Sequence, residues 1–292
     1  MTMTAAVTQF ASPLLSQDPS PGGYLSIRNV CKTYDPEGAC IEALRDCSLE
    51  VAAGAFVAIV GPSGCGKSTL LNMIAGFDTV SRGEIYMDGR PLAAPNVPPR
   101  PGPDRVVVFQ NGALFPWRTA LENVSYGPVR QGILTRKQAR QKAADLLRKC
   151  KLDAVAGAYP GQLSSGMQRR VEIARALINE PRVLLLDEPF RAMDTVSKTT
   201  MHQHLLDMYR MSRKTIVFIT HDLEEAIYLA DTVIVMTTRP ATIKCVIGVK
   251  LQRPRHPKIM FSHEYLELKR QAAESIHEEA RKAFERGERE QA

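Results

Sequence analysis

The chain has 292 residues, of which 44% are hydrophobic and 24% are charged. A chain of this length and apolar content buries a large core, which excludes disorder of the whole chain and favours one large domain, alone or with a subdomain. The longest apolar runs have the length of strands, far short of the roughly 18 residues that a membrane-spanning helix needs, so we expect a soluble protein.

The formal net charge is +7 and the sequence pI is about 9.1, values that nucleic-acid-binding proteins also reach. Residues 90–151 hold twelve Lys and Arg against three Asp and Glu, so this segment alone accounts for the excess. Its arginines are spread singly, without interleaved aromatic residues. This pattern favours a solvated helical face over a nucleic-acid surface, and a position beside a membrane is a third alternative.

Residues 1–23 contain no Lys or Arg, so they lack the charged start of a secretory signal and are predicted to form a flexible leader. The six cysteines form no CxxC pair, and a chain of this size does not need disulfides to fold. We therefore expect reduced thiols in a cytosolic protein, and no zinc site. The cysteines are Cys31, Cys40, Cys47, Cys65, Cys150 and Cys245.

Three segments alternate between apolar and polar residues, as antiparallel edge strands do: residues 24–34, a stretch around 43–51, and residues 83–89. Four short apolar runs without alternation are separated by long helical stretches, which is typical of a mostly parallel sheet buried on both faces. These runs are residues 56–60, 183–186, 215–220 and 232–236. The predicted fold class is therefore α/β, with a mostly parallel core sheet and an antiparallel β subdomain at its edge.

A Pro-rich connector over residues 90–104 leads into VVVFQ at 106–110. From about residue 111 to residue 178 the sequence is helical, which predicts a helical subdomain inserted into a main domain of residues 24–252. The tail, residues 253–292, is predicted to contain a charged amphipathic helix that lies on the surface or docks. The apolar positions at helix spacing near the end of the subdomain are Val171, Ala174, Leu177 and Ile178.

The predicted strand at 56–60 is followed by GPSGCGKS, which matches the pattern G-x-x-x-x-G-K-[ST]. Glycines let backbone N–H groups turn toward phosphate oxygens, and the helix that follows points its positive end at the same anion. A Gly-rich turn without a ligand is the alternative, but the strand before and the helix after favour a nucleotide. Lys67 then reaches the β and γ phosphates, and the Ser68 hydroxyl binds Mg²⁺. The predicted loop residues are Gly61, Pro62, Ser63, Gly64, Cys65, Gly66, Lys67, Ser68 and Thr69.

Two carboxylates, Asp187 and Glu188, end the predicted strand at 183–186, and His221 follows the strand at 215–220. Because parallel strands carry ligands at their carboxyl ends, we expect these side chains beside the phosphates. Asp187 would complete the Mg²⁺ site, Glu188 would polarise the attacking water, and His221 would bind the γ phosphate or hold that water. The alternatives are a solvated acidic turn and a packed core histidine.

Residues 163–166 read LSSG at the start of a predicted helix, where unpaired N–H groups and a partial positive charge favour an anion. One phosphate loop already serves one triphosphate. We therefore expect Ser164, Ser165 and Gly166 to face the nucleotide of another chain.

The order of these motifs, GPSGCGKS, VVVFQ, LSSGMQRR, LLLDEP and ITHD, resembles the ATP-binding cassette family over about residues 25–245. The resemblance implies a P-loop ATPase that uses Mg²⁺ and works as a head-to-tail dimer, with each ATP between the phosphate loop of one chain and the LSSG segment of the other. It also implies that Gln110 links Mg²⁺ in the catalytic site to a membrane subunit, and that Asp194 lies where the two sites meet. Tyr34 is implied to stack on adenine, with packing in an edge strand as the alternative.

Two departures from the family pattern matter for hydrolysis. The pattern LSGGQ has Gly where this chain has Ser165, so we expect this side chain to crowd the γ phosphate and slow the reaction. The turn after Glu188 carries Arg191 and Met193 where small residues and Leu are usual. Pairing of Arg191 with an acidic residue of the partner is one interpretation.

Because the chain has no apolar run of membrane-spanning length, the resemblance implies separate permease subunits, contacted near residues 110–118. PGPDRVVVFQ, LFPWRTALENV and MTTRP resemble importers of nitrate, sulfonates, taurine and similar small solutes. The implied partners are a second copy or a paired ATPase subunit, the permease, and indirectly a solute-binding protein, at the cytoplasmic face of the inner membrane. Trp117 either belongs to the permease contact or packs in the core.

Two other function classes fit the sequence less well than import. A soluble cassette ATPase acting on nucleic acid or in translation usually carries two cassettes or a long coiled-coil insertion, and neither pattern is present in this sequence. A small-molecule kinase that shares only the phosphate loop does not need LSSG or the histidine after the third strand. We therefore expect no nucleic-acid partner.

Overall fold

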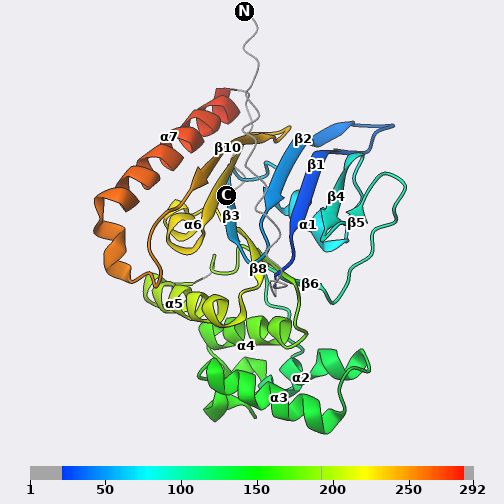
Figure 1. Ribbon diagram of the computed structural model, residues 1–292, viewed down its shortest axis with the longest axis vertical. Helices are drawn as coiled ribbons and strands as arrows, with labels where there is room; N and C mark the ends of the chain where they lie inside the picture. The colour runs from blue at the N-terminus through cyan, green and yellow to red at the C-terminus, as the bar shows by residue number, and fades with distance from the viewer. Residues whose placement is uncertain (1–21, 192, 286–292) are drawn as a thin grey trace, which may run out of the picture.

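The computed structural model describes residues 22–191 and 193–285, which form two β-sheets with helices packed around them (Figure 1). The flexible leader predicted for residues 1–23 lies outside the described residues, except for Gly22 and Gly23. The predicted α/β fold class is confirmed, and the two sheets differ in strand direction as expected.

A six-stranded sheet forms the centre of the fold. Its strands are β3 (Phe56–Val60), β6 (Arg105–Val108), β7 (Val183–Asp187), β8 (Thr215–Ile219), β9 (Thr232–Met236) and β10 (Ile243–Gly248). They lie in the order β10-β9-β3-β8-β7-β6, all parallel except β10, which pairs antiparallel with β9 at one edge. The four apolar runs that predicted parallel strands correspond to β3, β7, β8 and β9.

Both faces of this sheet are covered, which explains why its strands do not alternate in polarity. On β3, Phe56, Ala58 and Val60 join the core under the helices. Val57 and Ile59 join the core shared with the second sheet. Packing from both sides fixes the carboxyl edge of the sheet, where the loops that carry polar residues begin.

The second sheet is antiparallel and contains β1 (Leu25–Tyr34), β2 (Ile41–Val51), β4 (Arg82–Met87) and β5 (Arg90–Ala93). The strand order is β2-β1-β4-β5. The three alternating segments of the sequence correspond to β1, β2 and β4. β5 is an addition, because its short sequence RPLA falls in the stretch predicted as a Pro-rich connector.

Three helices, α2 (Ala120–Arg130), α3 (Arg136–Lys149) and α4 (Ser165–Leu177), form the helical subdomain at the bottom of Figure 1. Thr119 and Thr135 begin α2 and α3 with capping boxes, in which each hydroxyl accepts a hydrogen bond from the N–H three residues later. Such caps satisfy N–H groups that a helix start leaves without partners. These local signals explain why the helices begin where they do.

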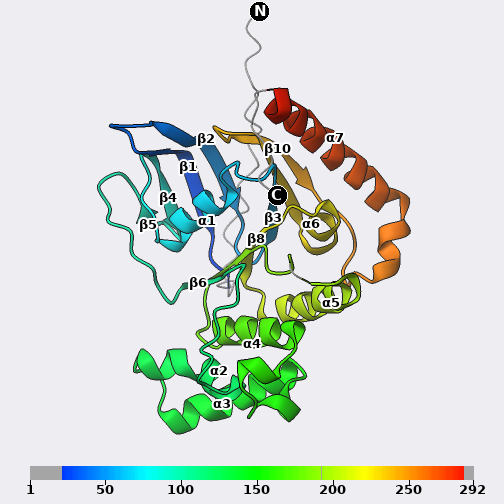
Figure 2. The same cartoon turned by 180° about the vertical axis from the view of Figure 1, so that it is seen from behind.

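Besides three short 3-10 helices, at Asp153–Val155, Pro160–Gln162 and Pro257–Phe261, four further α-helices in the described residues cover the sheets. They are α1 (Lys67–Ala75), α5 (Thr195–Ser212), α6 (Leu223–Leu229) and α7 (His263–Glu285). Helix α7 runs along α6 and β10 in both views (Figures 1 and 2), with Tyr265 and Ala272 buried in the core. The amphipathic helix predicted in the tail therefore packs against the main domain. Among the residues that the structure describes, no helix is long and apolar enough to cross a membrane.

Candidate nucleotide-binding site

The phosphate loop, residues 61–68, follows β3 at the carboxyl edge of the central sheet, and its last two residues, Lys67 and Ser68, begin α1. Gly66 has a φ angle of 119°, a conformation that glycine adopts without strain. Lys67 is buried and turns its ammonium back onto the loop, where Nζ donates to the carbonyl oxygens of Gly61 at 2.9 Å and Pro62 at 2.8 Å. The positive charge is therefore held at the loop itself.

The back of this loop packs closely against neighbouring strands. A side chain at Gly66 would place its Cβ 3.0 Å from Leu44 Cδ2 and 3.1 Å from the carbonyl oxygen of Ala43. A Cβ at Gly61 would lie 3.0 Å from the carbonyl oxygen of Met236. The close approach of the loop to β2 and β9 therefore requires glycine at both positions. The exposed residues on the open side of the loop are Ser63, Gly64 and Ser68.

A hydroxyl and a carboxylate meet beside the loop. Ser68 Oγ donates to Asp187 Oδ1 at 3.2 Å, which joins the start of α1 to the end of β7. Burial raises the pKa of the Asp187 carboxyl and the charge of Glu188 raises it further, while the Ser68 hydrogen bond and the Lys67 charge oppose this shift. Oxygen ligands of this kind are those that Mg²⁺ prefers, and a cation would offset the cost of burying the carboxylate. Ser68 and Asp187 therefore fit a magnesium site.

Glu188 follows β7 with a φ angle of 41°, which is uncommon for a residue with a side chain. Its N–H donates to the carbonyl oxygen of Ile219 at 3.0 Å, which ties the turn to β8. Its Oε2 lies 3.5 Å from Nδ1 of His221, and the histidine side chain is 50% exposed. The structure thus gathers five of the predicted residues at one sheet edge: Lys67, Ser68, Asp187, Glu188 and His221.

Arg191 pairs with Glu188 within the chain, a contact that the sequence analysis did not predict, and its pairing with an acidic residue of a partner stays a prediction. Its Nη1 donates to Glu188 Oε2 at 3.3 Å. The reason is the tight turn after β7, in which the Arg191 N–H also donates to the Glu188 carbonyl oxygen at 3.3 Å. This turn brings the guanidinium back over the carboxylate.

A buried polar cluster begins at Thr220, the residue before His221. Thr220 Oγ1 donates to Glu225 Oε2 at 2.7 Å, and Glu225 Oε1 lies 3.1 Å from Lys198 Nζ and 3.4 Å from His202 Nε2. Burial opposes ionisation of Glu225, but hydrogen bonds from His202 and Thr220 and the charge of Lys198 hold its pKa below the usual range. Sequence reasoning missed this cluster, because Glu225 resembles any acidic residue in the first turn of a helix.

Gln110 follows β6, and α4 holds the backbone around it. Arg169 Nη2 donates to the carbonyl oxygen of Gln110 at 2.7 Å, and Arg169 Nη1 donates to that of Phe109 at 2.7 Å. Glu172 accepts from Arg169 at 2.6 Å and from the N–H of Ala113 at 2.6 Å. Both charged side chains are buried. This pair was not predictable from the sequence, because charges three residues apart on a helix usually indicate a solvated face.

The LSSG segment forms the N-terminus of α4. Ser164 is the cap, and its Oγ accepts a hydrogen bond from the N–H of Met167 at 3.3 Å. Ser164 and Ser165 are exposed, and Gly166 is half-buried. Helix α4 lies apart from α1 in both views (Figures 1 and 2), so this segment does not complete the phosphate loop of its own chain.

Two further predicted residues lie around this edge. Asp194 caps α5, with its Oδ1 accepting from the N–H groups of Val196 and Ser197 at 3.1 and 3.0 Å. Tyr34 ends β1, and its hydroxyl donates to Asp78 Oδ2 at 2.8 Å while Lys32 Nζ lies 4.8 Å from the ring centroid. The lysine covers one face of the ring. Stacking of Tyr34 on adenine stays a prediction and requires the other face.

Comparison with known proteins gives consistent relatives. A family model described as ABC transporter matches residues 44–191. An uncharacterised ABC transporter ATP-binding protein of Methanocaldococcus jannaschii is 39% identical over 260 residues, covering 89% of this chain and 94% of the relative. A nitrate import ATP-binding protein of Synechococcus elongatus is 39% identical over 258 residues, covering 87% and 92%. A bicarbonate transport ATP-binding protein of Synechocystis sp. is 39% identical over 279 residues, covering 94% and 97%.

Solved structures agree with these sequence relatives. One is the dimeric structure of a post-hydrolysis state of an ATP-binding cassette bound to ADP and Pi. Its chain has 32% sequence identity to this one, and the two folds superpose with a TM-score of 0.66. The match covers 78% of this chain and 100% of that one. Sequence and fold therefore lead to one conclusion: the chain belongs to the ABC transporter family and is an ATPase that binds and hydrolyses ATP.

Proposed function

We propose that this chain is the ATPase subunit of a membrane importer, in which ATP-driven closure of a dimer powers the uptake of a small solute. The observation that carries the proposal is the placement of Glu188 and His221 3.5 Å apart, at the same sheet edge as the loop of Lys67. A general base, a polar partner for phosphate and a lysine-bearing loop are the groups that hydrolysis of a nucleoside triphosphate needs.

Each residue of the site has a defined task in this proposal. Lys67 exchanges the loop carbonyls, which it now binds at 2.8 and 2.9 Å, for the β and γ phosphate oxygens. Ser68 and Asp187 hold Mg²⁺, which when bound shields the phosphate charge. Glu188 takes a proton from the attacking water, and His221 hydrogen-bonds the γ phosphate or holds that water.

The second half of each site comes from another chain. The exposed N-terminus of α4 offers the N–H groups after Ser164 to an anion, and its own phosphate loop lies elsewhere. A solved relative of this cassette is a dimer. We propose a head-to-tail dimer, with Ser164, Ser165 and Gly166 facing the γ phosphate of the partner and Asp194 between the two sites.

Two hollows support a docking surface for permease subunits, one between β6 and the helical subdomain and one on the helical subdomain itself. One, of about 360 Å³, lies beside the Gln110 segment, and its lining includes Phe109, Phe115 and Tyr126. Trp117 packs near Phe115 with ring centroids 5.7 Å apart and is 70% exposed, so the alternative that it packs in the core is wrong. The other hollow, of about 410 Å³, is lined in part by four arginines, Arg118, Arg130, Arg136 and Arg140.

These surfaces suggest the chemistry of the permease contact. Exposed aromatic rings fit an apolar helix or loop, and the arginines fit acidic side chains. The basic excess of residues 90–151 then serves a membrane complex, and the import relatives favour this over the nucleic-acid alternative. We propose that the chain is peripheral, on the cytoplasmic face of the inner membrane, and that a solute-binding protein acts through the permease.

The proposed solute is a small oxyanion. The relatives named for nitrate and for bicarbonate have the same 39% identity to this chain. Both solutes are small planar ions with a single negative charge. The ATPase sequence does not distinguish the two, because the permease and the solute-binding protein select the solute.

The catalytic part of the proposal is tested by Glu188→Gln. Loss of the base is expected to lower the hydrolysis rate by about 10²- to 10⁴-fold. Nucleotide affinity stays unchanged, and with ATP and Mg²⁺ the dimer accumulates, as size-exclusion chromatography with light scattering would show. An unchanged hydrolysis rate would mean that Glu188 is not the base.

The transport part is tested by isolating the native protein from membranes. We expect a multi-span permease to co-purify, and ATP hydrolysis to be stimulated when the solute-binding protein and its solute are added to the reconstituted complex. Association with RNA or DNA that nuclease treatment removes would instead support the soluble ATPase.

A further inference from the structure

The loop after β9 reaches the phosphate loop through Arg239. Its Nη2 donates to the carbonyl oxygen of Gly64 at 3.0 Å. A peptide unit is planar, so its C=O and its N–H point in opposite directions, and a bond that holds the Gly64 carbonyl also orients the N–H of Cys65. That N–H points back into the loop, 3.3 Å from the carbonyl oxygen of Pro62. Arg239 therefore acts on the backbone that forms the phosphate site.

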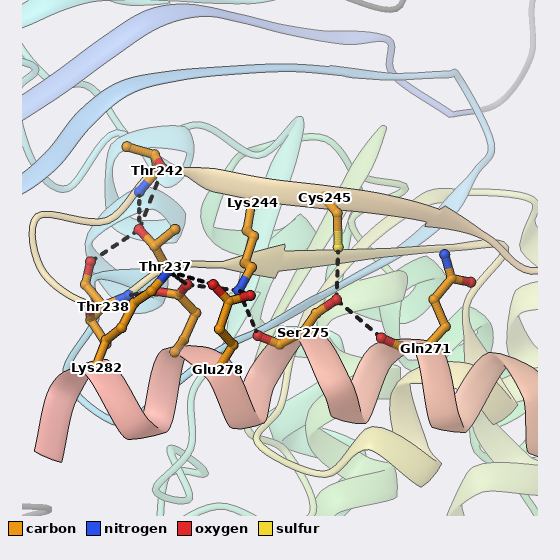
Figure 3. A network of polar contacts seen from close by, with 10 residues as sticks. Thr237, Thr238, Thr242, Lys244, Cys245, Gln271, Ser275, Glu278 and Lys282 are labelled. Atoms are coloured by element: carbon orange, nitrogen blue, oxygen red, sulfur yellow. Dashed lines mark hydrogen bonds and ion pairs between the residues drawn. The ribbon is translucent and has the colours of Figure 1, made fainter. Parts of the chain in front are cut away.

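The loop that carries Arg239 is closed on itself. The Thr237 N–H donates to the carbonyl oxygen of Thr242 at 3.0 Å, and the Thr242 N–H donates to Thr237 Oγ1 at 2.9 Å (Figure 3). The N–H of the buried Ala241 donates to the carbonyl oxygen of Ala43 on β2 at 3.0 Å. These bonds hold the backbone on both sides of Arg239.

A carboxylate from α7 completes this support. Oε2 of Glu279 accepts from the N–H of Thr238, the neighbour of Arg239, at 3.2 Å. Oε1 of Glu279 accepts from Lys244 Nζ at 2.8 Å and from Lys282 Nζ at 3.0 Å. Burial opposes ionisation of Glu279, which is 2% exposed, but the two lysines and the Thr238 N–H hold its pKa below the usual range. A charged carboxylate therefore ties the C-terminal helix to the loop.

Helix α7 is anchored along its length, so this tie belongs to a docked helix. Lys244 on β10 also donates to the carbonyl oxygen of Ser275 at 3.1 Å and to Glu278 Oε2 at 2.6 Å (Figure 3). Toward the start of the helix, the Tyr265 hydroxyl donates to the carbonyl oxygen of Glu224 on α6 at 3.2 Å. The position of α7 is therefore passed through Glu279 to the loop of Arg239.

We propose that Arg239 is a positioning residue of the phosphate loop and that Glu279 sets its place, so that docking of α7 tunes the affinity of the site for ATP. The inference rests on the proposed nucleotide site at residues 61–68. It gives the C-terminal helix a task in nucleotide binding, although no described residue of α7 belongs to the set at the sheet edge.

The test measures binding of a fluorescent ATP analogue to the full chain, together with kcat and KM for ATP. Arg239→Gln and Glu279→Gln are each expected to raise Kd and KM by about three- to tenfold, because each loses one charge-assisted hydrogen bond. The kcat of each variant should stay within about twofold of the wild-type value. Arg239→Lys, which keeps the charge and one donor, recovers part of the affinity. If Glu279 acts through Arg239, the double variant binds no more weakly than Arg239→Gln alone.

Glu278→Gln is the matched control, because Glu278 shares Lys244 with Glu279, whereas the hydrogen bond to Thr238 in the loop of Arg239 comes from Glu279. Its Kd is expected to stay unchanged. The inference is overturned if Arg239→Gln binds the analogue with the Kd of the wild type. It is also overturned if Glu279→Gln lowers the melting temperature but keeps the wild-type Kd, since α7 would then be a purely structural helix. Lys67→Ala separates the two levels: if it fails to weaken binding, the nucleotide site itself is wrong, whereas if it weakens binding and Arg239→Gln does not, only this inference fails.

Discussion

Arg191 and Glu188 form an ion pair across the turn after β7, with Nη1 of the arginine 3.3 Å from Oε2 of the glutamate. The same oxygen lies 3.5 Å from Nδ1 of His221. The carboxylate oxygen that is proposed to accept a proton from the attacking water therefore has two side chains close to it.

Arg191→Ser is expected to raise kcat of the ATPase by about two- to fivefold, because one competitor for Oε2 is removed at the cost of one half-exposed hydrogen bond. Steady-state hydrolysis at saturating ATP measures the effect, and Arg191→Lys, which keeps a cation there, should change it less. A clear fall in kcat would show that the arginine assists the reaction.

Ser165→Gly is expected to keep kcat or to raise it by up to about threefold, because the substitution removes a side chain from the face proposed to meet a γ phosphate. The fold should tolerate it, since Ser164 remains the cap of α4. Hydrolysis by the assembled dimer is the measurement. A loss of tenfold or more would identify the serine as a contact to phosphate.

The raised pKa of Asp187 predicts a pH dependence of Mg²⁺ binding. Burial, and then the charge of Glu188, favours the protonated form, so a proton competes with the cation at higher pH than at an ordinary aspartate. Mg²⁺ affinity, measured by titration with an ATP analogue, is therefore expected to weaken as the pH falls, and to begin to weaken at a higher pH than an ordinary aspartate would give. Saturating Mg²⁺ should suppress the effect, and Asp187→Asn should remove most of the affinity and leave only the pH dependence that the nucleotide itself contributes.

Glu172→Gln should be strongly destabilising. Burial lowers the pKa of Arg169, and the carboxylate of Glu172 is the charge that opposes this shift. Removing it leaves a buried guanidinium without a counter-charge, which costs about 3–5 kcal/mol and lowers the melting temperature by about 10 °C.

Glu267→Gln is the control for Glu172→Gln, because Glu267 forms an exposed pair with Arg270 at the same spacing of three residues. It should change the melting temperature by no more than about 2 °C. If the two variants lowered the melting temperature equally, the buried ion pair would contribute no more to stability than the exposed one.

The central strands and the phosphate loop were predictable because their signals are local. In β3 all five residues are buried, so the run is apolar throughout, and the loop follows it directly in the sequence. The position of Glu188 and His221 at one edge of the sheet was also predictable, since both follow parallel strands, but their direct contact was not. The helices α2 and α3 begin at threonines whose capping pattern is visible in four residues.

The supporting carboxylates were not predictable, because their partners lie far away along the chain. Glu172, Glu225 and Glu279 each lie in a charged helical sequence, and such glutamates usually face solvent. Only the fold shows that they are buried against Arg169, against Lys198 with His202, and against Lys244. The pairing of Arg191 was missed for a different reason, since a turn of this kind is defined by backbone angles that the sequence does not display.

Helix α4 connects the proposed nucleotide contact with the proposed permease contact. It begins at the serines proposed to contact the nucleotide of the partner chain. One turn later, Arg169 donates a hydrogen bond to the backbone of Gln110, on the side where a permease is proposed to dock. One helix therefore connects the two proposed contacts. We expect a tilt of α4 at its first turn to shift the backbone of Gln110 directly, through the hydrogen bond from Arg169, without a change of side-chain conformation in between.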